Sequence, residues 1–133
     1  MATIFTRIIN GEIPAYQIAE DENFIAILDI NPLVKGHALV IPKQEVDYIF
    51  DLEDSTYLGL FFFAKKVGAA IEKTVPCERI GMAVIGLEVP HVHVHLVPLN
   101  NMGDINFTKS RVQLSKEEFE QLAQDIRANF QQA

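Results

Sequence analysis

Three of the four histidines in the chain stand at alternate positions of one short run, as His91, His93 and His95. Side chains of a β-strand alternate between its two faces, so a strand here would place all three imidazoles on one face. The apolar residues between them would cover the other face, and the β-branched valines favour a strand. Buried imidazoles each need a hydrogen-bond partner or a ligand, so this run predicts a functional site.

Two kinds of chemistry are open to such a run. In the first, the histidines bind a metal ion, with Glu88 or His37 completing the coordination, since neutral imidazole is a common metal ligand. In the second, one imidazole nitrogen attacks phosphorus and a second donates protons to the phosphate or the leaving group. The third would then hold the tautomer of the nucleophile. The spacing by itself leaves both chemistries open.

Composition limits the possible partners. The chain has 133 residues, 49% hydrophobic and 22% charged, so we expect residues 1–133 to form one globular domain. A net charge of −7 at pH 7 argues against a nucleic acid polymer or an anionic membrane as partner, but allows a small phosphorylated ligand. Cys77 is the single cysteine and the N-terminus has no secretory signal pattern, so we expect a cytoplasmic protein without a disulfide.

The elements that must position the histidines are five short strands and a short N-terminal helix. Apolar spacing predicts this helix over residues 3–10. Strand patterns bounded by turn residues cover residues 15–19, 24–28, 37–42, 79–85 and 89–97. Short turns between strands predict a mainly antiparallel sheet with helices packed on it, an α+β fold.

Two longer helices complete the prediction. The first covers residues 51–74, with Asp54 or Ser55 as its cap. Its expected core residues are Leu58, Phe61, Phe62, Ala69 and Ile71. The last helix begins with a capping box, in which Ser115 is the cap and Glu118 the third helical residue. Its expected core residues are Phe119, Leu122, Ala123, Ile126 and Phe130.

The run from His91 to Val97 resembles the signature of the histidine triad (HIT) superfamily of nucleotide hydrolases and transferases. Residues 4–15 and 24–43 resemble the N-terminal and central segments of that family. The resemblance implies a HIT-like fold, a five-stranded sheet with one long and one C-terminal helix. It also implies a homodimer formed by the long helix and a strand, which would cover part of Phe61–Phe63.

The resemblance implies a role for each site residue. His93 would be the nucleophile that forms a nucleotidyl-histidine, and His95 would contact the phosphate and the leaving group. His91 would fix the geometry behind His93, and His37 would support the site. The positions implied for nucleotide binding are Asp29, Ile30, Gly86, Glu88 and Val89. The implied substrate is a purine nucleoside phosphoramidate or a related nucleoside monophosphate ester, and no cofactor is implied.

Two departures from the family pattern qualify these expectations. Many bacterial relatives bind a structural zinc near the N-terminus, but here Thr3, Thr6 and Glu45 replace its ligands, so we predict no zinc at this place. The loop before the histidines is short and carries Leu87, which cannot hydrogen-bond a phosphate. Dinucleoside polyphosphate hydrolysis, or nucleotide binding with little catalysis, therefore remain alternatives.

Overall fold

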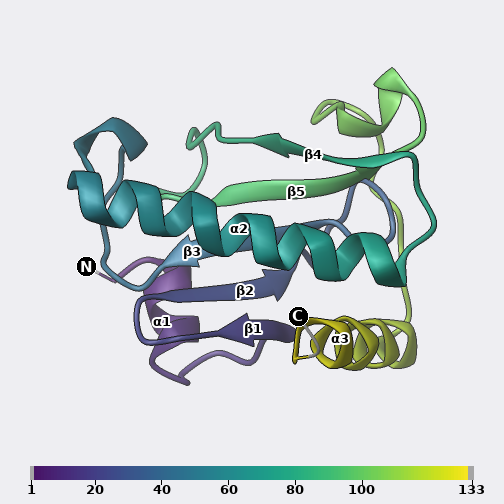
Figure 1. The fold of residues 1–133 in the computed structure, drawn as a ribbon, viewed down its shortest axis with the longest axis horizontal. Helices are drawn as coiled ribbons and strands as arrows, with labels where there is room; N and C mark the ends of the chain where they lie inside the picture. Colours follow the sequence, from purple (N-terminus) through teal and green to yellow (C-terminus); the bar gives the residue numbers. More distant parts are fainter. Residues whose placement is uncertain (1, 132–133) are drawn as a thin grey trace.

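The chain folds into one five-stranded sheet with helices on both faces (Figure 1). The computed structural model describes residues 2–131. Neighbouring strands run antiparallel in the order β1-β2-β3-β5-β4, which confirms the predicted α+β class. The strands are β1 (Gln17–Glu20), β2 (Phe24–Leu28), β3 (Ala38–Pro42), β4 (Arg79–Ala83) and β5 (Val94–Leu99).

Within the described residues, three α-helices pack on the sheet, two on one face and one on the other. They are α1 (Ile4–Ile9), α2 (Asp54–Thr74) and α3 (Lys116–Gln131), with 3₁₀ turns η1 (Ile49–Asp51) and η2 (Met102–Ile105). Figure 1 shows the long α2 lying along the sheet, with α3 beside β1. Within residues 2–131, no helix combines the length and apolar character needed to cross a lipid bilayer.

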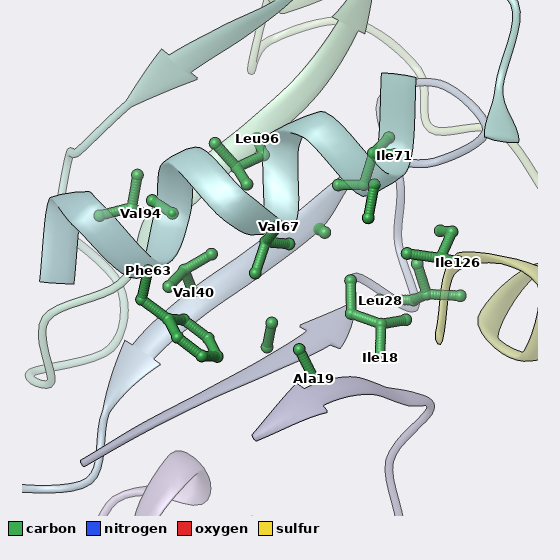
Figure 2. Packing of buried hydrophobic residues seen from close by; sticks show 14 of the residues in the cluster. Ile18, Ala19, Leu28, Val40, Phe63, Val67, Ile71, Val94, Leu96 and Ile126 are labelled. Carbon is green, nitrogen blue, oxygen red and sulfur yellow. The ribbon is translucent and has the colours of Figure 1, made fainter. Parts of the chain in front are cut away.

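The strand alternation divides the buried residues into two cores. On the α2 and α3 face, Val40, Val94 and Leu96 pack with Phe63, Val67, Ile71 and Ile126, as Figure 2 shows. On the opposite face, Phe5 of α1 packs with Ile25, Ile27, Leu39 and Ile41. Leu39 pairs directly with His95 across β3 and β5, so the histidines share the α1 face of the sheet. Val92, Val94 and Leu96 cover the other face, as predicted.

The histidine strand begins later than its sequence pattern predicts. The pattern covers residues 89–97, but β5 starts at Val94. The partner strand β4 ends at Ala83, opposite His95, and β3 ends at Pro42, which has no N–H to donate. His91 and His93 therefore lie in a segment just before the paired strand, where their rings and carbonyls are free for other hydrogen bonds. The remaining strand and helix boundaries agree within three residues.

Of the predicted core residues of α2, Ile71 is buried and Phe61 packs partly buried against the core, but Leu58, Phe62 and Ala69 are exposed. The predicted core face of α3 is correct. The buried residues of α2 are Leu60, Phe63, Ala64, Val67, Gly68, Ala70 and Ile71. Leu58 and Phe62 are 68% and 62% exposed, because α2 carries two apolar stripes and the sheet covers only one. Its N-cap is Glu53, without a side-chain capping bond, so neither Asp54 nor Ser55 caps the helix. The Ser115–Glu118 capping box of α3 is present, with both reciprocal hydrogen bonds formed.

Candidate active site

The fold brings His37 beside the histidine run from a distant part of the sequence. His37 immediately precedes β3, the neighbour of β5 in the sheet. The turn before it depends on Gly36, whose φ of 98° is unfavourable for residues with a Cβ. A Cβ at Gly36 would also lie only 3.0 Å from side-chain atoms of Val75 and Pro98. This turn therefore places the fourth histidine next to the other three.

Hydrogen bonds fix the tautomers of His91 and His93. The carbonyl oxygen of Pro42 accepts from His91 Nε2 at 2.8 Å, so His91 Nδ1 is left to accept from the Thr3 hydroxyl, also at 2.8 Å. The carbonyl oxygen of His91 accepts from His93 Nδ1 at 2.8 Å. Because a carbonyl can only accept, His93 carries its proton on Nδ1. In the neutral ring, Nε2 of His93 then holds the lone pair that a nucleophile needs.

A second chain of hydrogen bonds fixes His37 and His95. The backbone N–H of Leu33 donates to His37 Nδ1 at 3.0 Å, which leaves the proton of the neutral His37 ring on Nε2. That Nε2–H donates to His95 Nδ1 at 2.9 Å. The neutral His95 ring must therefore carry its own proton on Nε2. The arrangement thus supplies one imidazole with a free lone pair, His93, and one with a free N–H, His95.

Burial favours the neutral form of three imidazoles, those of His37, His91 and His95. It lowers the pKa of His37 to about 3 and the pKa of His95 to about 4, with neighbouring positive charges acting in the same direction. Burial also lowers the pKa of His91, although the Pro42 carbonyl and Glu45 oppose this effect. The pKa of Asp29 is raised, again chiefly by burial. The neutral forms of His37, His91 and His95 are therefore the forms that burial favours.

A cavity of about 530 Å³ opens in front of His93 and His95. It is of a size that accommodates a small-molecule ligand. Of the residues predicted from the sequence, seven line it: Asp29, Ile30, Gly86, Glu88, Val89, His93 and His95. The other two, His91 and His37, lie behind the lining, at 0% and 1% exposure. This placement separates the two lining histidines from the two that support them.

The turn before the histidine run forms one wall of this cavity. Gly86 has a φ of 73°, so the turn uses a conformation that favours glycine. Leu87 lines the cavity and is 89% exposed, and Glu88 is also exposed. Leu87 can therefore make apolar contact with a ligand. It cannot donate a hydrogen bond to a phosphate at this position.

Several residues of the cavity were not predicted from the sequence. Phe5 contacts the rings of His91 and His93, with centroids 5.7 and 5.0 Å away. Phe107 contacts His95 at 4.7 Å, and Arg111 lies beside Phe107. No local motif marks Phe107 or Arg111, because they follow in an irregular segment after β5. The apolar spacing of α1 could have suggested Phe5, but only as a core residue.

The residues near the N-terminus do not fit a zinc site. Thr6 donates its hydroxyl proton to Glu45 at 2.6 Å, and Glu45 also accepts from the backbone N–H of Thr3 at 3.0 Å. Thr3 in turn donates to His91, whose second nitrogen binds the Pro42 carbonyl. Neutral hydroxyls are poor zinc ligands, and both nitrogens of His91 have hydrogen-bond partners. His91 is thus held in position by hydrogen bonds from and to protein groups, at the place where a zinc ion could otherwise hold it.

The histidines of the active site are also poorly arranged for a metal. Asp29, His37 and His95 bring ligand atoms within 4.8 Å of one another. However, His37 Nε2 and His95 Nδ1 are 2.9 Å apart, a hydrogen-bond distance. Two nitrogen ligands of one tetrahedral zinc ion lie roughly 3.3 Å apart at ordinary bond lengths. The distance between these two nitrogens therefore suits a hydrogen bond better than shared coordination of one zinc ion.

Fold and site together define a class of protein, an α+β domain in which two histidines face a cavity and two further histidines lie behind them. Comparison with known proteins gives the family. The family model described as HIT domain matches residues 10–102. An uncharacterized HIT-like protein of Borreliella burgdorferi is 32% identical over 96% of this chain and 97% of its own length. This chain therefore belongs to the HIT family.

Two further comparisons concern activity and structure. The adenosine 5'-monophosphoramidase hnt1 of Schizosaccharomyces pombe is 38% identical, over 76% of this chain and 77% of its own. The crystal structure of a zinc-bound histidine triad family protein from Mycobacterium smegmatis matches with a TM-score of 0.85 and 30% identity. That match covers 99% of this chain and 95% of the other. The HIT-like fold expected from the sequence is thus confirmed.

Proposed function

We propose that this protein hydrolyses purine nucleoside phosphoramidates, or related nucleoside monophosphate esters, through a nucleotidyl-histidine intermediate. The observation that carries the proposal is the complementary pair of tautomers, a lone pair on His93 and an N–H on His95, at one cavity. The similarity to an adenosine 5'-monophosphoramidase supports the same reaction class. Apolar residues from α1, β2 and their flanking loops, suited to a purine base, line the cavity: Ile4, Ile8, Ile13, Ile27 and Ile30.

The proposed reaction proceeds in two displacements. His93 Nε2 attacks the α-phosphorus, a P–N bond forms, and the leaving group departs with the electron pair of its bond to phosphorus and takes up a proton, which the water of the second step replaces. Water then attacks the phosphorus, which releases the nucleoside monophosphate and restores His93. The N–H of His95 hydrogen-bonds the phosphate oxygens or the bridging atom in both steps. His37 and His91 act as positioning residues, because they set the tautomers and orientations of His95 and His93.

Comparative kinetics tests this proposal. We expect purified protein to release AMP from adenosine 5'-phosphoramidate faster than from a dinucleoside polyphosphate, and rapid acid quench to trap AMP covalently on the protein. The reverse preference would favour the dinucleoside polyphosphate alternative. AMP binding without turnover of either compound would indicate a binding module, and turnover abolished by a strong chelator would indicate a metalloenzyme.

We also propose that the protein acts as a homodimer through α2 and the edge strand β4. Leu58 and Phe62 form an exposed apolar stripe on α2, and Met82 of β4 is 48% exposed. β4 lies at one edge of the sheet, so its outer backbone groups can pair with a second copy. A two-fold interface uses the same patch on both copies, and this stripe next to an unpaired edge is a suitable patch.

The expected result for the dimer is a sedimentation mass of two chains for the native protein and one chain for Phe62→Glu, since the variant buries a charge in the interface. Met102→Glu is the matched control, because Met102 is 92% exposed and lies on η2. A native protein that sediments as a monomer, or a Phe62→Glu variant that stays dimeric, would contradict this interface.

We further propose that residues 1–133 act as one domain in the cytoplasm. The single, half-buried Cys77 suits a reducing compartment.

A further inference from the structure

The irregular segment between η2 and α3 packs against the loop that precedes His37, and it lies beyond the residues that the family model matches. Two of its N–H groups donate to successive carbonyl oxygens of this loop. Arg111 Nη1 donates to the carbonyl oxygen of Asn31 at 2.7 Å. The backbone N–H of Val112 donates to the carbonyl oxygen of Pro32 at 2.9 Å. These two hydrogen bonds hold the middle of the loop in one orientation.

The orientation of the loop decides where the backbone N–H of Leu33 points. The carbonyl and the N–H of one trans peptide point in opposite directions, because the peptide unit is planar. In the peptide between Pro32 and Leu33, the carbonyl accepts from Val112 and the N–H donates to His37 Nδ1 at 3.0 Å. Leu33 is fully buried, at 0% exposure. The peptide held by the segment is thus the one that supplies the donor to His37.

The carboxylate of Asp29 is oriented by the same loop. The backbone N–H of Asn31 donates to Asp29 Oδ1 at 2.8 Å, and Asp29 Oδ2 lies 3.6 Å from His37 Nε2. A carboxylate at this distance favours a proton on that nitrogen. Burial raises the pKa of Asp29, and the charge of Arg111 opposes this effect, so Arg111 also favours the ionised carboxylate. The two groups that set the tautomer of His37 therefore both belong to the loop that the segment holds.

The tautomer of His37 in turn decides which group His95 presents to the cavity. His37 Nε2 donates to His95 Nδ1 at 2.9 Å, which leaves the proton of the neutral His95 ring on Nε2. If the peptide after Pro32 turned over, its carbonyl would face His37 Nδ1, and His37 would carry its proton on that nitrogen. His37 Nε2 would then accept from His95 Nδ1, and His95 Nε2 would present a lone pair in place of an N–H.

The segment also contacts the two imidazoles directly. Phe107 packs edge-on against His95 and His37, with ring centroids 4.7 and 6.2 Å apart. The central carbon of the Arg111 guanidinium lies 5.9 Å from the centre of the Phe107 ring. Asp104 anchors the start of the segment by accepting from two backbone N–H groups of the turn after β5, at 2.7 and 3.0 Å. An anchored segment thus restrains the rings of His37 and His95 as well as their protons.

We propose that Arg111 is a positioning residue for His95. Together with the N–H of Val112, Arg111 holds the loop so that His95 keeps its proton on Nε2. This inference rests on the proposed hydrolysis, in which that N–H hydrogen-bonds the phosphate oxygens or the bridging atom. Its contribution is largest where negative charge develops on the departing atom, so a poor leaving group depends on Arg111 more than a good one.

Two substrates that differ in their leaving atom test this role. Adenosine 5'-phosphoramidate releases an amine nitrogen that needs a hydrogen bond as it departs, whereas the 4-nitrophenyl ester of AMP releases a stable phenolate. Arg111→Met removes the N–H donors and keeps an apolar stem of similar length. We expect kcat/KM for the phosphoramidate to fall by about 10-fold. This is less than the roughly 100- to 1,000-fold cost of losing a whole donor, because the Val112 hydrogen bond remains. The ester should change by less than about threefold.

Arg127→Met is the control variant. Arg127 also donates one Nη1–H to a backbone carbonyl, that of Gln17 at 2.6 Å, but it does not line the cavity. We expect its kcat/KM values to equal those of the native protein on both substrates. An equal loss on both substrates in Arg111→Met would overturn the proposal, because Arg111 would then act on substrate binding or on the fold. An unchanged kcat/KM for the phosphoramidate would overturn it as well.

Nitrogen-15 NMR of the imidazole rings separates the failure of this inference from the failure of the proposed hydrolysis. It shows which nitrogen of His37 and of His95 carries the proton, and it needs no substrate. We expect Nε2 for both residues in the native protein and in Arg127→Met, and a measurable fraction of His95 protonated on Nδ1 in Arg111→Met. If the native protein turns over neither substrate, the hydrolysis proposal fails and this measurement still tests Arg111. Native tautomers in Arg111→Met would overturn the inference even if the hydrolysis is confirmed.

Discussion

The His93→Ala variant is expected to lose nucleotide hydrolysis by at least about a thousandfold, because it removes the nucleophile of both displacements. His93 lines the cavity, and its Nδ1–H is held by the His91 carbonyl at 2.8 Å, which directs the lone pair of the neutral ring to Nε2. No other described side chain that lines the cavity combines a free imidazole lone pair with this support. The measurement is steady-state release of AMP, together with acid-quench trapping of AMP on the protein.

The fold and the nucleotide site should survive this substitution. His93 makes one side-chain hydrogen bond, to a backbone carbonyl, so its removal leaves the sheet hydrogen bonds in place. Circular dichroism and AMP calorimetry check this expectation. Cys77→Ala is the matched control, since it removes a different nucleophile in the turn after α2 and should leave trapping unchanged. Full activity of His93→Ala, or AMP still trapped on it, would show that the nucleophile is another residue.

The second large effect is acid destabilisation from the buried imidazoles. Burial lowers the pKa of His37 to about 3 and that of His95 to about 4, whereas a histidine in the unfolded chain titrates near 6.5. Below pH 6.5 the unfolded chain therefore binds more protons than the folded one. The stabilisation is fully present above pH 6.5 and is lost as the pH falls toward the folded pKa values. Each of these histidines should cost about 1.4 kcal/mol of unfolding free energy per pH unit in this interval.

Urea unfolding between pH 7.5 and 4.5 measures this slope. Together, His37 and His95 should lower the free energy of unfolding by roughly 3 kcal/mol per pH unit. This is a large share of the roughly 5–15 kcal/mol that is typical of a domain. His91, whose pKa is also lowered, acts in the same direction, whereas the raised pKa of Asp29 opposes the loss. His37→Gln keeps an N–H for His95 but cannot titrate, so it should reduce the slope by about 1.4 kcal/mol per unit. An unfolding free energy that is constant between pH 6.5 and 5 would contradict the neutral assignment.

The sequence determined the local pattern of this protein. A period of two residues placed the three imidazoles on one face, and the Ser115–Glu118 box defined the start of α3. Both depend on interactions within a few residues, which the local sequence encodes. The expected role of His37 and the residues expected to line the cavity came from the resemblance to the HIT family. These residues are far apart in the sequence, so no local pattern in one chain indicates that they meet.

Tertiary structure decided which surfaces meet. The two apolar stripes of α2 are similar in sequence, and only the placement of the sheet buried Phe63 and left Phe62 exposed. Thr3 reaches His91 across 88 residues and Arg111 reaches Asn31 across 80, and neither contact leaves a local pattern. The tautomers of His91 and His95 likewise follow from distant partners, the Pro42 carbonyl and His37. The alternation His91, His93 and His95 thus predicted a site. The local bond to the His91 carbonyl leaves the lone pair on Nε2 of His93, whereas the long-range bond from His37 leaves the proton of His95 on Nε2.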